Sequence, residues 1–303
     1  MTLRIAFQMV PIENINREED TTFRIAEEAQ RRGHKLFYYL PQDLTYFETD
    51  LVCEGYEVSV DRISEKHFSL GPRRRLNLVK NVDILWLRQD PPFDMSYITT
   101  THLLDFLKHK TLVVNNPFWV RNYPEKILML NYPDLIPPTI VSRSILMLKS
   151  FREKHGDVIV KPLYGNGGSG VFKIGANDPN LNSLIELFYN ISKEPIIMQK
   201  YMPEVISGDK RVILINGDPV GAINRIPRDG EIRSNMHVGG KAVKADLTSR
   251  DLEICDRIGP LMRETGQVLV GLDIIGDMLT EINLTSPTGI QELERFDQIN
   301  VAG

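Results

Sequence analysis

The sequence predicts an α/β protein with an open parallel sheet in its first third and mixed α and β structure after it. Up to about residue 120, short apolar runs typical of buried strands alternate with helical segments. From about Pro124 this alternation stops, and hairpin signals appear at Asn216-Gly217 and Gly276-Asp277, each between two apolar runs. We therefore expect three parts, at residues 1–122, 123–201 and 202–303.

The expected elements follow from apolar runs and from capping residues. In the first part we expect strands at 3–10, 35–40, 82–87 and 111–114 and helices at 20–33 and 98–108. In the second part we expect helices at 126–132, 144–154 and 181–191 and strands at 158–161, 171–174 and 196–199. The triple arginine Arg73-Arg74-Arg75 is typical of a solvated loop between elements. We expect it there and not in a binding site.

Composition excludes several classes of protein. The chain has 303 residues, of which 42% are hydrophobic and 25% charged, and its formal net charge is -4. It has no basic face that would indicate nucleic acid or an anionic membrane. Cys53 and Cys255 are far apart, which favours a reduced compartment over a disulfide or thiolate metal site. No apolar run approaches the roughly 20 residues of a membrane helix, so we expect a cytoplasmic protein.

A glycine-rich loop is the first candidate site. Gly165-Asn166-Gly167-Gly168-Ser169-Gly170 fits G-x-G-x-x-G, but a dinucleotide fold requires a helix directly afterwards. Residues 171–174 are instead β-branched or aromatic, or lysine, which predicts a strand. No Lys-Ser or Lys-Thr ends the run, which excludes a Walker A loop. We expect a flap whose backbone N–H groups cover phosphates; the alternative is a merely mobile loop.

Two lysines bracket this flap. Lys161 ends an apolar strand beside the loop, where its ammonium can contact a polyphosphate. Lys126 lies in the helix at the start of the second part, and its residue context alone does not separate phosphate binding from a solvated position. For both, the alternative is a side chain that reaches the surface along an apolar stem.

Acidic residues near the C-terminus form the second candidate site. Residues 268–275 and 279–284 predict two strands of a hairpin, with Glu281 and Asn283 on one face. An odd loop of three residues, 276–278, would place Asp273 opposite Glu281, whereas a two-residue turn would send it to the other face. We expect the odd loop. Two buried carboxylates and an amide oxygen suit Mg²⁺ shared with substrate phosphates; the alternative is a salt-bridged surface hairpin.

Arginines between these two sites are candidates for substrate carboxylates. Arg211 precedes the strand expected at 212–215, and Arg225 precedes a long polar stretch that contains Arg233. Long loops of this kind are usually lids or disordered. Arginine presents a planar two-pronged donor array suited to carboxylates, although some of the three are expected to be solvated.

Taken together, these residues resemble the ATP-grasp superfamily, and more closely the bacterial-type glutathione synthetases. The resemblance covers nearly the whole chain, and it separates this family from D-alanine–D-alanine ligases. Its most specific pieces are Arg88-Gln89-Asp90-Pro91-Pro92-Phe93-Asp94, Val160-Lys161-Pro162-Leu163, Gly208-Asp209-Lys210-Arg211 and 270–276 running on to 281–288.

The resemblance implies an ATP-grasp fold with an N-terminal open parallel α/β domain, a central lid subdomain and a C-terminal α+β subdomain containing a β-hairpin. It also implies a homo-oligomer, either a dimer or a tetramer. The implied reaction adds glycine to γ-glutamylcysteine through an acyl phosphate, with ATP cleaved to ADP and phosphate and with Mg²⁺ or Mn²⁺ bound. The alternatives are another ATP-grasp ligase, such as a dipeptide or amino-acid-tagging enzyme, or a nucleotide-binding regulator without turnover.

The resemblance also assigns roles to residues of this chain. Asp273, Glu281 and Asn283 would hold the metal, and Arg225, Arg233 and Lys161 are the candidate catalytic residues. Arg88, Asp90, Arg225 and the segment Ser286-Pro287-Thr288 would orient the peptide substrate. The residues expected around ATP are Lys126, Lys161, Gly165, Asn166, Gly167, Gly168, Ser169, Gly170, Val171, Gln199, Lys200, Tyr201, Met202, Asp209, Lys210, Arg211 and Gly240.

Overall fold

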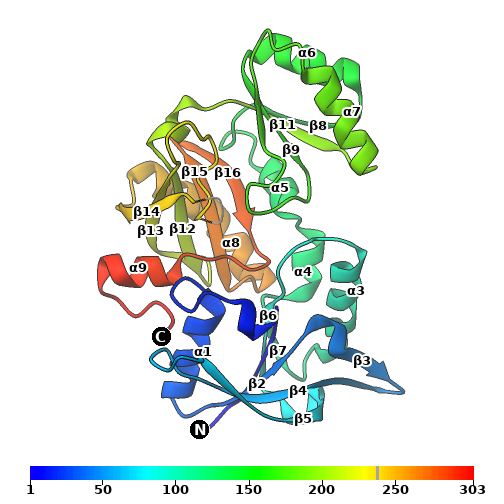
Figure 1. Cartoon of the computed structure of the whole chain (residues 1–303), viewed down its shortest axis with the longest axis vertical. Helices are drawn as coiled ribbons and strands as arrows, with labels where there is room; N and C mark the ends of the chain where they lie inside the picture. The colour runs from blue at the N-terminus through cyan, green and yellow to red at the C-terminus, as the bar shows by residue number, and fades with distance from the viewer. Residues whose placement is uncertain (237–238) are drawn as a thin grey trace.

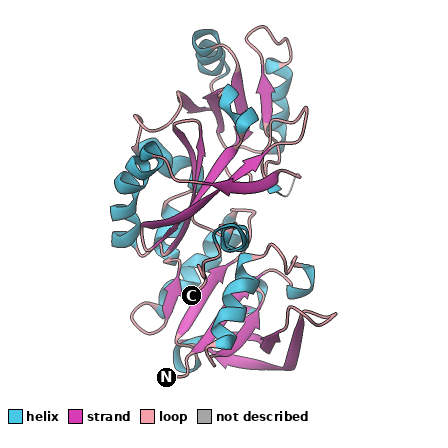
Figure 2. Ribbon diagram, turned by 90° about the vertical axis from the view of Figure 1, so that its left-hand side faces the viewer, coloured by secondary structure: helices cyan, strands magenta, loops and turns pink. Residues whose placement is uncertain are grey.

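Three sheets follow one another along the long axis of the molecule (Figure 1). The structure, a computed structural model, describes residues 1–236 and 239–303. An N-terminal sheet lies at one end, a five-stranded sheet lies in the middle, and a four-stranded sheet with two helices lies at the other end (Figure 1). Figure 2 shows the same arrangement from the side. The expected mixed α/β class is confirmed.

The N-terminal sheet has the strand order β3-β4-β2-β1-β6-β7, with β5 paired to β4. Its parallel pairs are β1 with β2, β1 with β6, and β6 with β7, as the sequence predicted. The antiparallel strands β3, β4 and β5 were not predicted. The elements are β1 Arg4–Met9, α1 Thr21–Arg31, β2 Lys35–Tyr39, β3 Leu44–Phe47, β4 Asp50–Val60, β5 Phe68–Asn77, α2 Leu78–Asn81, β6 Ile84–Arg88, α3 Met95–Leu104, β7 Leu112–Val114 and α4 Pro117–Asn122.

The triple arginine lies in strand β5, so the expected loop is wrong. All three side chains are nevertheless exposed, because β5 lies at an edge of the sheet. Arg73 pairs with Asp43 and Arg74 with Glu57. Charged side chains of this kind keep an edge strand from pairing with another chain, which explains a charge run inside a strand.

The four-stranded sheet, in the order β10-β9-β11-β8, carries α6 and α7 (Figure 1). Its strands pair antiparallel, and most of its predicted elements are found within one or two residues of their expected ends. Strand β8 was not predicted, and the expected helix at 126–132 is a single turn, α5, followed by a 3-10 turn. The elements are α5 Glu125–Leu128, β8 Thr139–Ser142, α6 Ile145–His155, β9 Val158–Pro162, β10 Phe172–Ile174, α7 Leu181–Ile191 and β11 Ile196–Lys200.

The five-stranded antiparallel sheet has the order β14-β13-β12-β15-β16. Helix α8 packs against it and begins with a capping box between Thr248 and Asp251. The elements are β12 Asp209–Ile215, β13 Asp218–Ile226, β14 Lys241–Ala245, α8 Ser249–Thr265, β15 Leu269–Ile275, β16 Met278–Asn283 and α9 Ile290–Asp297.

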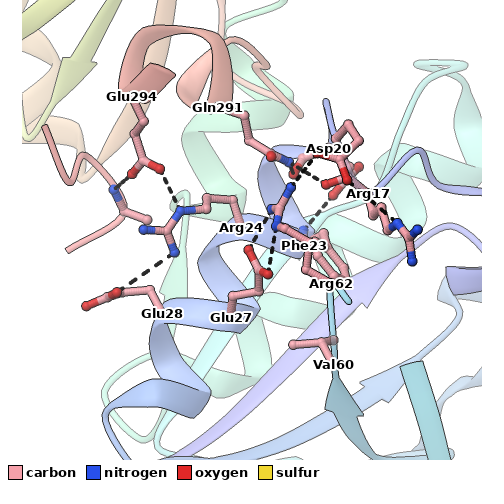
Figure 3. A network of polar contacts seen from close by, with 12 residues as sticks. Arg17, Asp20, Phe23, Arg24, Glu27, Glu28, Val60, Arg62, Gln291 and Glu294 are labelled. Atoms are coloured by element: carbon pink, nitrogen blue, oxygen red, sulfur yellow. Dashed lines mark hydrogen bonds and ion pairs between the residues drawn. The ribbon is translucent and has the colours of Figure 1, made fainter. Parts of the chain in front are cut away.

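Helix α9 returns the chain to the N-terminal domain, where it packs on α1. Arg24 of α1 donates from Nε to Glu294 over 2.6 Å, and Gln291 donates to the backbone oxygen of Asp20 over 2.6 Å (Figure 3). One apolar core also crosses this boundary, since Phe23 of α1 and Leu293 of α9 belong to the same cluster. The N-terminal domain and the middle sheet therefore share a packed interface.

Candidate functional site

A cavity lies between the four-stranded and the five-stranded sheet. One wall comes from β9, the glycine loop and β11, and the opposite wall comes from β15 and β16. Residues 232–235 of the long loop after β13 also line it. The flap and the acidic hairpin, about 110 residues apart in the chain, therefore meet at one cavity.

The glycine loop connects β9 to β10, so the expected strand–loop–strand unit is present. Gly167, Gly168 and Gly170 have φ of 61°, 79° and 68°. Residues other than glycine rarely adopt this left-handed backbone conformation. The loop can therefore lie flat over the cavity with its backbone groups available to a ligand.

Both lysines that bracket the flap face the cavity, but their surroundings differ. Lys126 donates from Nζ to Glu281 over 2.8 Å and to the oxygen of Gly165 over 2.5 Å. Burial lowers the pKa of Lys161, and within the described part of the chain we find no ion pair for it. Lys161 therefore brings to the cavity a positive charge that feels Glu281 without a direct ion pair among the described residues, while Lys126 links the flap to the hairpin.

The acidic hairpin has a two-residue turn, Gly276-Asp277, so the expected odd loop length is wrong. A register shift between Asp273 and Ile274 leaves Thr280 as an extra residue on β16. This β-bulge restores Asp273 to the position opposite Glu281. Asp273 and Glu281 thus face each other as expected, but because of a β-bulge and not because of an odd loop length.

Asp273 is held by two arginines. Arg211 donates from Nε and Nη2 over 2.5 and 2.9 Å, and Arg225 lies 3.0 Å away. Burial raises the pKa of Asp273, but the two guanidinium groups outweigh burial and hold it below its usual value. Asp273 is therefore an anion at neutral pH.

Asp209 belongs to the same buried cluster. Its Oδ2 accepts from Arg225 over 2.6 Å and from the hydroxyl of Ser234 over 2.9 Å. Its Oδ1 is buried without a hydrogen-bond partner among the described residues. Burial raises its pKa to about 6, although Arg225 acts in the opposite direction. One carboxylate oxygen at the cavity wall is thus left available.

Glu281 is balanced by lysines. Burial raises its pKa, but the charges of Lys126 and Lys161 outweigh burial, and the net shift is downward. Among residues 1–236 and 239–303, no three His, Cys, Asp or Glu side chains form a metal-binding group. The donors present are two facing carboxylates and Asn283, whose amide nitrogen donates to Gly271 over 3.2 Å and leaves its oxygen to accept.

The long loop after β13 reaches the flap and the acidic cluster. Arg233 lies 3.5 Å from the oxygen of Gly168, and its Nη2 pairs with Glu231 over 2.6 Å. Ser234 donates to Asp209, as described above. A Cβ at Gly240 would lie 1.9 Å from the backbone oxygen of Ser234, so only glycine fits there. The two loops therefore close the cavity together.

The expected peptide-binding residues lie beside the cavity, between the N-terminal domain and the end of β16. Arg88 is buried and donates to the hydroxyl of Thr22 and to the backbone oxygen of Pro287, both over 3.0 Å. Burial lowers the pKa of Arg88, and the charges of Asp20 and Asp90 act in the opposite direction. The backbone oxygen of Thr288 accepts from Arg211 over 3.2 Å.

The structure separates the expected site residues into three groups. The first lines the cavity: Lys126, Lys161, Gly165, Asn166, Gly167, Gly168, Ser169, Val171, Gln199, Lys200, Tyr201, Met202, Asp209, Arg233, Asp273 and Glu281. The second, Arg211 and Arg225, touches it through Asp273. The third is not in the cavity lining: Arg88, Asp90, Gly170, Lys210, Gly240, Asn283, Ser286, Pro287 and Thr288.

Lys210 points away from the cavity. Successive side chains of a strand face opposite sides, and its Nζ pairs with Asp251 of α8 over 2.5 Å. Sequence reasoning missed several lining residues, above all the apolar wall of Pro137, Ile159, Val205 and Ile275. Alternation along β9 and β15 would have found two of them, because Ile159 and Ile275 lie two residues from Lys161 and Asp273.

Solved structures place this fold in a known class. A RimK-domain ATP-grasp protein from Sphaerobacter thermophilus superposes with a TM-score of 0.65 at 16% identity, covering 99% of this chain and 97% of its own. D-cycloserine synthetase DcsG gives a TM-score of 0.64 at 16% identity, covering 94% and 92%. The chain therefore has the ATP-grasp fold that its site geometry indicates.

Sequence comparisons define the family. Models of the prokaryotic glutathione synthetase N-terminal domain and ATP-grasp domain match residues 3–121 and 125–298. Glutathione synthetases of Brucella melitensis and Mesorhizobium japonicum are each 51% identical over 302 residues, covering all of this chain and 96% of theirs. That of Salmonella typhimurium is 38% identical, covering 99% of this chain and 96% of its own.

The protein is an ATP-dependent ligase of the ATP-grasp class. Within that class, the chain belongs to the prokaryotic glutathione synthetase family. ATP and small-molecule substrates follow from this membership. Within the described residues, the structure contains no helix that is long and apolar enough to span a membrane.

Proposed function

We propose that this chain joins γ-glutamylcysteine to glycine in two steps at the cavity described above. The carboxylate of the cysteine residue attacks the γ-phosphorus of ATP, which forms an acyl phosphate and releases ADP. The amine of glycine then attacks the acyl carbon, phosphate leaves, and the new amide bond completes glutathione. Neither step needs a covalent nucleophile on the protein.

The convergence of lysines, flap and acidic hairpin on one cavity supports this proposal. Lys161 brings a positive charge that forms no direct ion pair among the described residues, which suits a polyphosphate. Residues 199–202, next to Ile159 and Val205, suit an adenine ring. The flap and the loop carrying Arg233 close the cavity and would keep water from the acyl phosphate.

Asp273, Glu281 and Asn283 are the proposed ligands for Mg²⁺ or Mn²⁺. Their oxygen donors suit a hard divalent cation, and Asp209 presents a further carboxylate oxygen without a partner among the described residues. A bound metal would neutralise phosphate charge and orient the γ-phosphate. Arg88, Asp90, Arg225 and residues 286–288 are the proposed contacts of the peptide substrate.

The test is phosphate release from ATP in mixtures that each lack one substrate. We expect release only when ATP, γ-glutamylcysteine and glycine are all present. Release that does not change when glycine is left out would contradict the proposal. A panel of acceptor amines would then distinguish glutathione formation from ligation to another amino acid.

The proposal includes a cytoplasmic homo-oligomer, either a dimer or a tetramer. The free, buried cysteines Cys53 and Cys255 support the cytoplasmic part of this proposal, because they suit a reducing compartment. Light scattering of the purified protein would decide the oligomeric state, and a mass equal to one chain of 34.6 kDa would contradict an oligomer.

A further inference from the structure

The segment that follows β16 has no regular secondary structure of its own. Residues 284–289 lie between β16 and α9 as bends and coil. The backbone oxygens of Pro287 and Thr288 nevertheless accept from Arg88 and Arg211. A segment without a helix or strand needs outside partners for its backbone groups, and these partners decide where it lies.

Glu125 supplies three of these contacts with a single atom. Its Oε1 accepts from the backbone N–H of Leu284 over 2.8 Å, from that of Thr285 over 3.0 Å and from the Thr285 hydroxyl over 2.9 Å. Asn115 fixes the other side of Leu284, because its amide donates to the Leu284 oxygen over 2.8 Å. The backbone N–H and the backbone oxygen of Leu284 are therefore both hydrogen-bonded to side chains from distant parts of the chain.

Glu125 is next to Lys126 in the one-turn helix α5, and the two side chains contact consecutive parts of the same strand. Lys126 pairs with Glu281 inside β16, while Glu125 holds the chain where β16 ends. One short helix thus fixes both the carboxylate proposed to face the phosphates and the segment proposed to face the peptide. A displacement of α5 would change the distance between these two groups.

We infer that Glu125 is a positioning residue, which sets the place of segment 284–288 and through it the place of the peptide substrate relative to the γ-phosphate. This inference rests on the function proposed above. Glu125 does not line the nucleotide cavity. Its removal is therefore expected to act on the dipeptide and not on ATP.

The experiment compares steady-state kinetics of Glu125→Gln and Thr285→Val with the unmodified chain. Glu125→Gln keeps the shape but removes the charge that strengthens three hydrogen bonds, and we expect KM for γ-glutamylcysteine to rise about 10-fold or more. KM for ATP, and ADP affinity measured by calorimetry, should stay within about twofold. Thr285→Val removes one bond only and should give a smaller rise in the same constant.

The matched control is Glu292→Gln. Glu292 is also a buried glutamate, but its partner is Arg295 and it lies in α9 away from the cavity. Its kinetic constants should not change. Equal losses of dipeptide and nucleotide affinity in Glu125→Gln, or an unchanged KM for the dipeptide, would overturn the inference.

Two further results would also be decisive. If Glu125→Gln does not fold, Thr285→Val decides, and an unchanged KM for the dipeptide in that variant rejects the positioning role. If the unmodified chain releases phosphate without γ-glutamylcysteine, the proposed function fails and the inference fails with it. If the unmodified chain needs all three substrates but KM for γ-glutamylcysteine is unchanged in both variants, the inference is rejected and the proposed function stands.

Discussion

Arg211 binds Asp273 through two parallel hydrogen bonds, of 2.5 and 2.9 Å, in a fully buried setting. This fork geometry is the strongest form of an arginine–carboxylate contact. It holds Asp273 ionised at the cavity wall before any ligand arrives. The carboxylate is thus oriented by the protein itself.

Removal of Arg211 should destabilise the fold. Arg211→Met leaves Asp273 with Arg225 as its only close arginine, and loss of one partner of a buried ion pair costs about 3–5 kcal/mol. Urea denaturation gives the free energy of unfolding. The control is Arg257→Met, since the Arg257–Asp134 pair is exposed to solvent and should contribute little to stability. Equal effects of both substitutions would contradict the assigned difference.

Metal removal should stop catalysis without unfolding the protein. Arg211, Arg225 and Lys126 already compensate Asp273 and Glu281 in the structure. We therefore expect EDTA to abolish phosphate release and Mg²⁺ to restore it, with no change in the melting temperature. A melting temperature that falls on chelation would indicate a structural metal instead.

The two candidate lysines Lys161 and Lys210 should differ in how much they contribute to nucleotide binding. Lys161→Met removes a cavity cation, and loss of a charged contact should weaken ATP binding by about 10-fold to 100-fold. Lys210→Met removes a lysine that pairs with Asp251 on the other face of β12. Its ATP affinity should equal that of the unmodified chain. Calorimetric titration with ATP measures both, and an equal loss would place Lys210 at the phosphates.

Ionisation of Glu28 should make the free energy of unfolding depend on pH. Hydrogen bonds from Arg31 lower its pKa to about 2, against the effect of burial and together with Arg32. A carboxyl group whose pKa is lower in the folded state stabilises above its unfolded pKa, and this stabilisation is lost as pH falls. The stability difference between the unmodified chain and Glu28→Gln should therefore be largest above about pH 5 and vanish near pH 2. A pH-independent difference would contradict the shift.

Two glycines with positive φ should differ in the cost of their replacement, because only one of them is closely packed. Gly217 has φ of 81°, and a Cβ there would lie 2.4 Å from the backbone oxygen of Gly259 in α8. Gly217→Ala should lower the free energy of unfolding by about 3 kcal/mol, from overpacking and backbone strain together. Gly156 has φ of 75° with nothing within 4 Å of its Cβ position. Gly156→Ala should cost about 1 kcal/mol, from strain alone. Similar losses in both would exclude the close approach.

Much of the site could be predicted from local signals. Val158 to Ile174 contain an apolar strand, a run of glycines and a second β-rich segment, so the flap follows from composition alone. The antiparallel strands β3–β5 could not be predicted in the same way, because their outward positions are charged and β5 carries three arginines. An exposed edge strand has no apolar alternation strong enough to distinguish it from a loop.

The hairpin shows a different limit. Its strands and its facing carboxylates were predicted, but the turn length was wrong because a bulge at Thr280 changes the register. Bulges depend on how neighbouring strands and helices press on a hairpin, which a single sequence does not contain. The direction of the Lys210 side chain could not be predicted for a related reason, since the face of a strand that meets the cavity is fixed by the register of β12 with β15.

The contact between α9 and α1 has a consequence for biosynthesis. Arg24 and Glu294 are 270 positions apart, so α1 is synthesised long before its partner helix α9. Until then the apolar face of α1 that includes Phe23 lacks its cover from Leu293. In a nascent chain of this protein, α1 should therefore be especially susceptible to protease, and this susceptibility should disappear only when α9 has emerged from the ribosome.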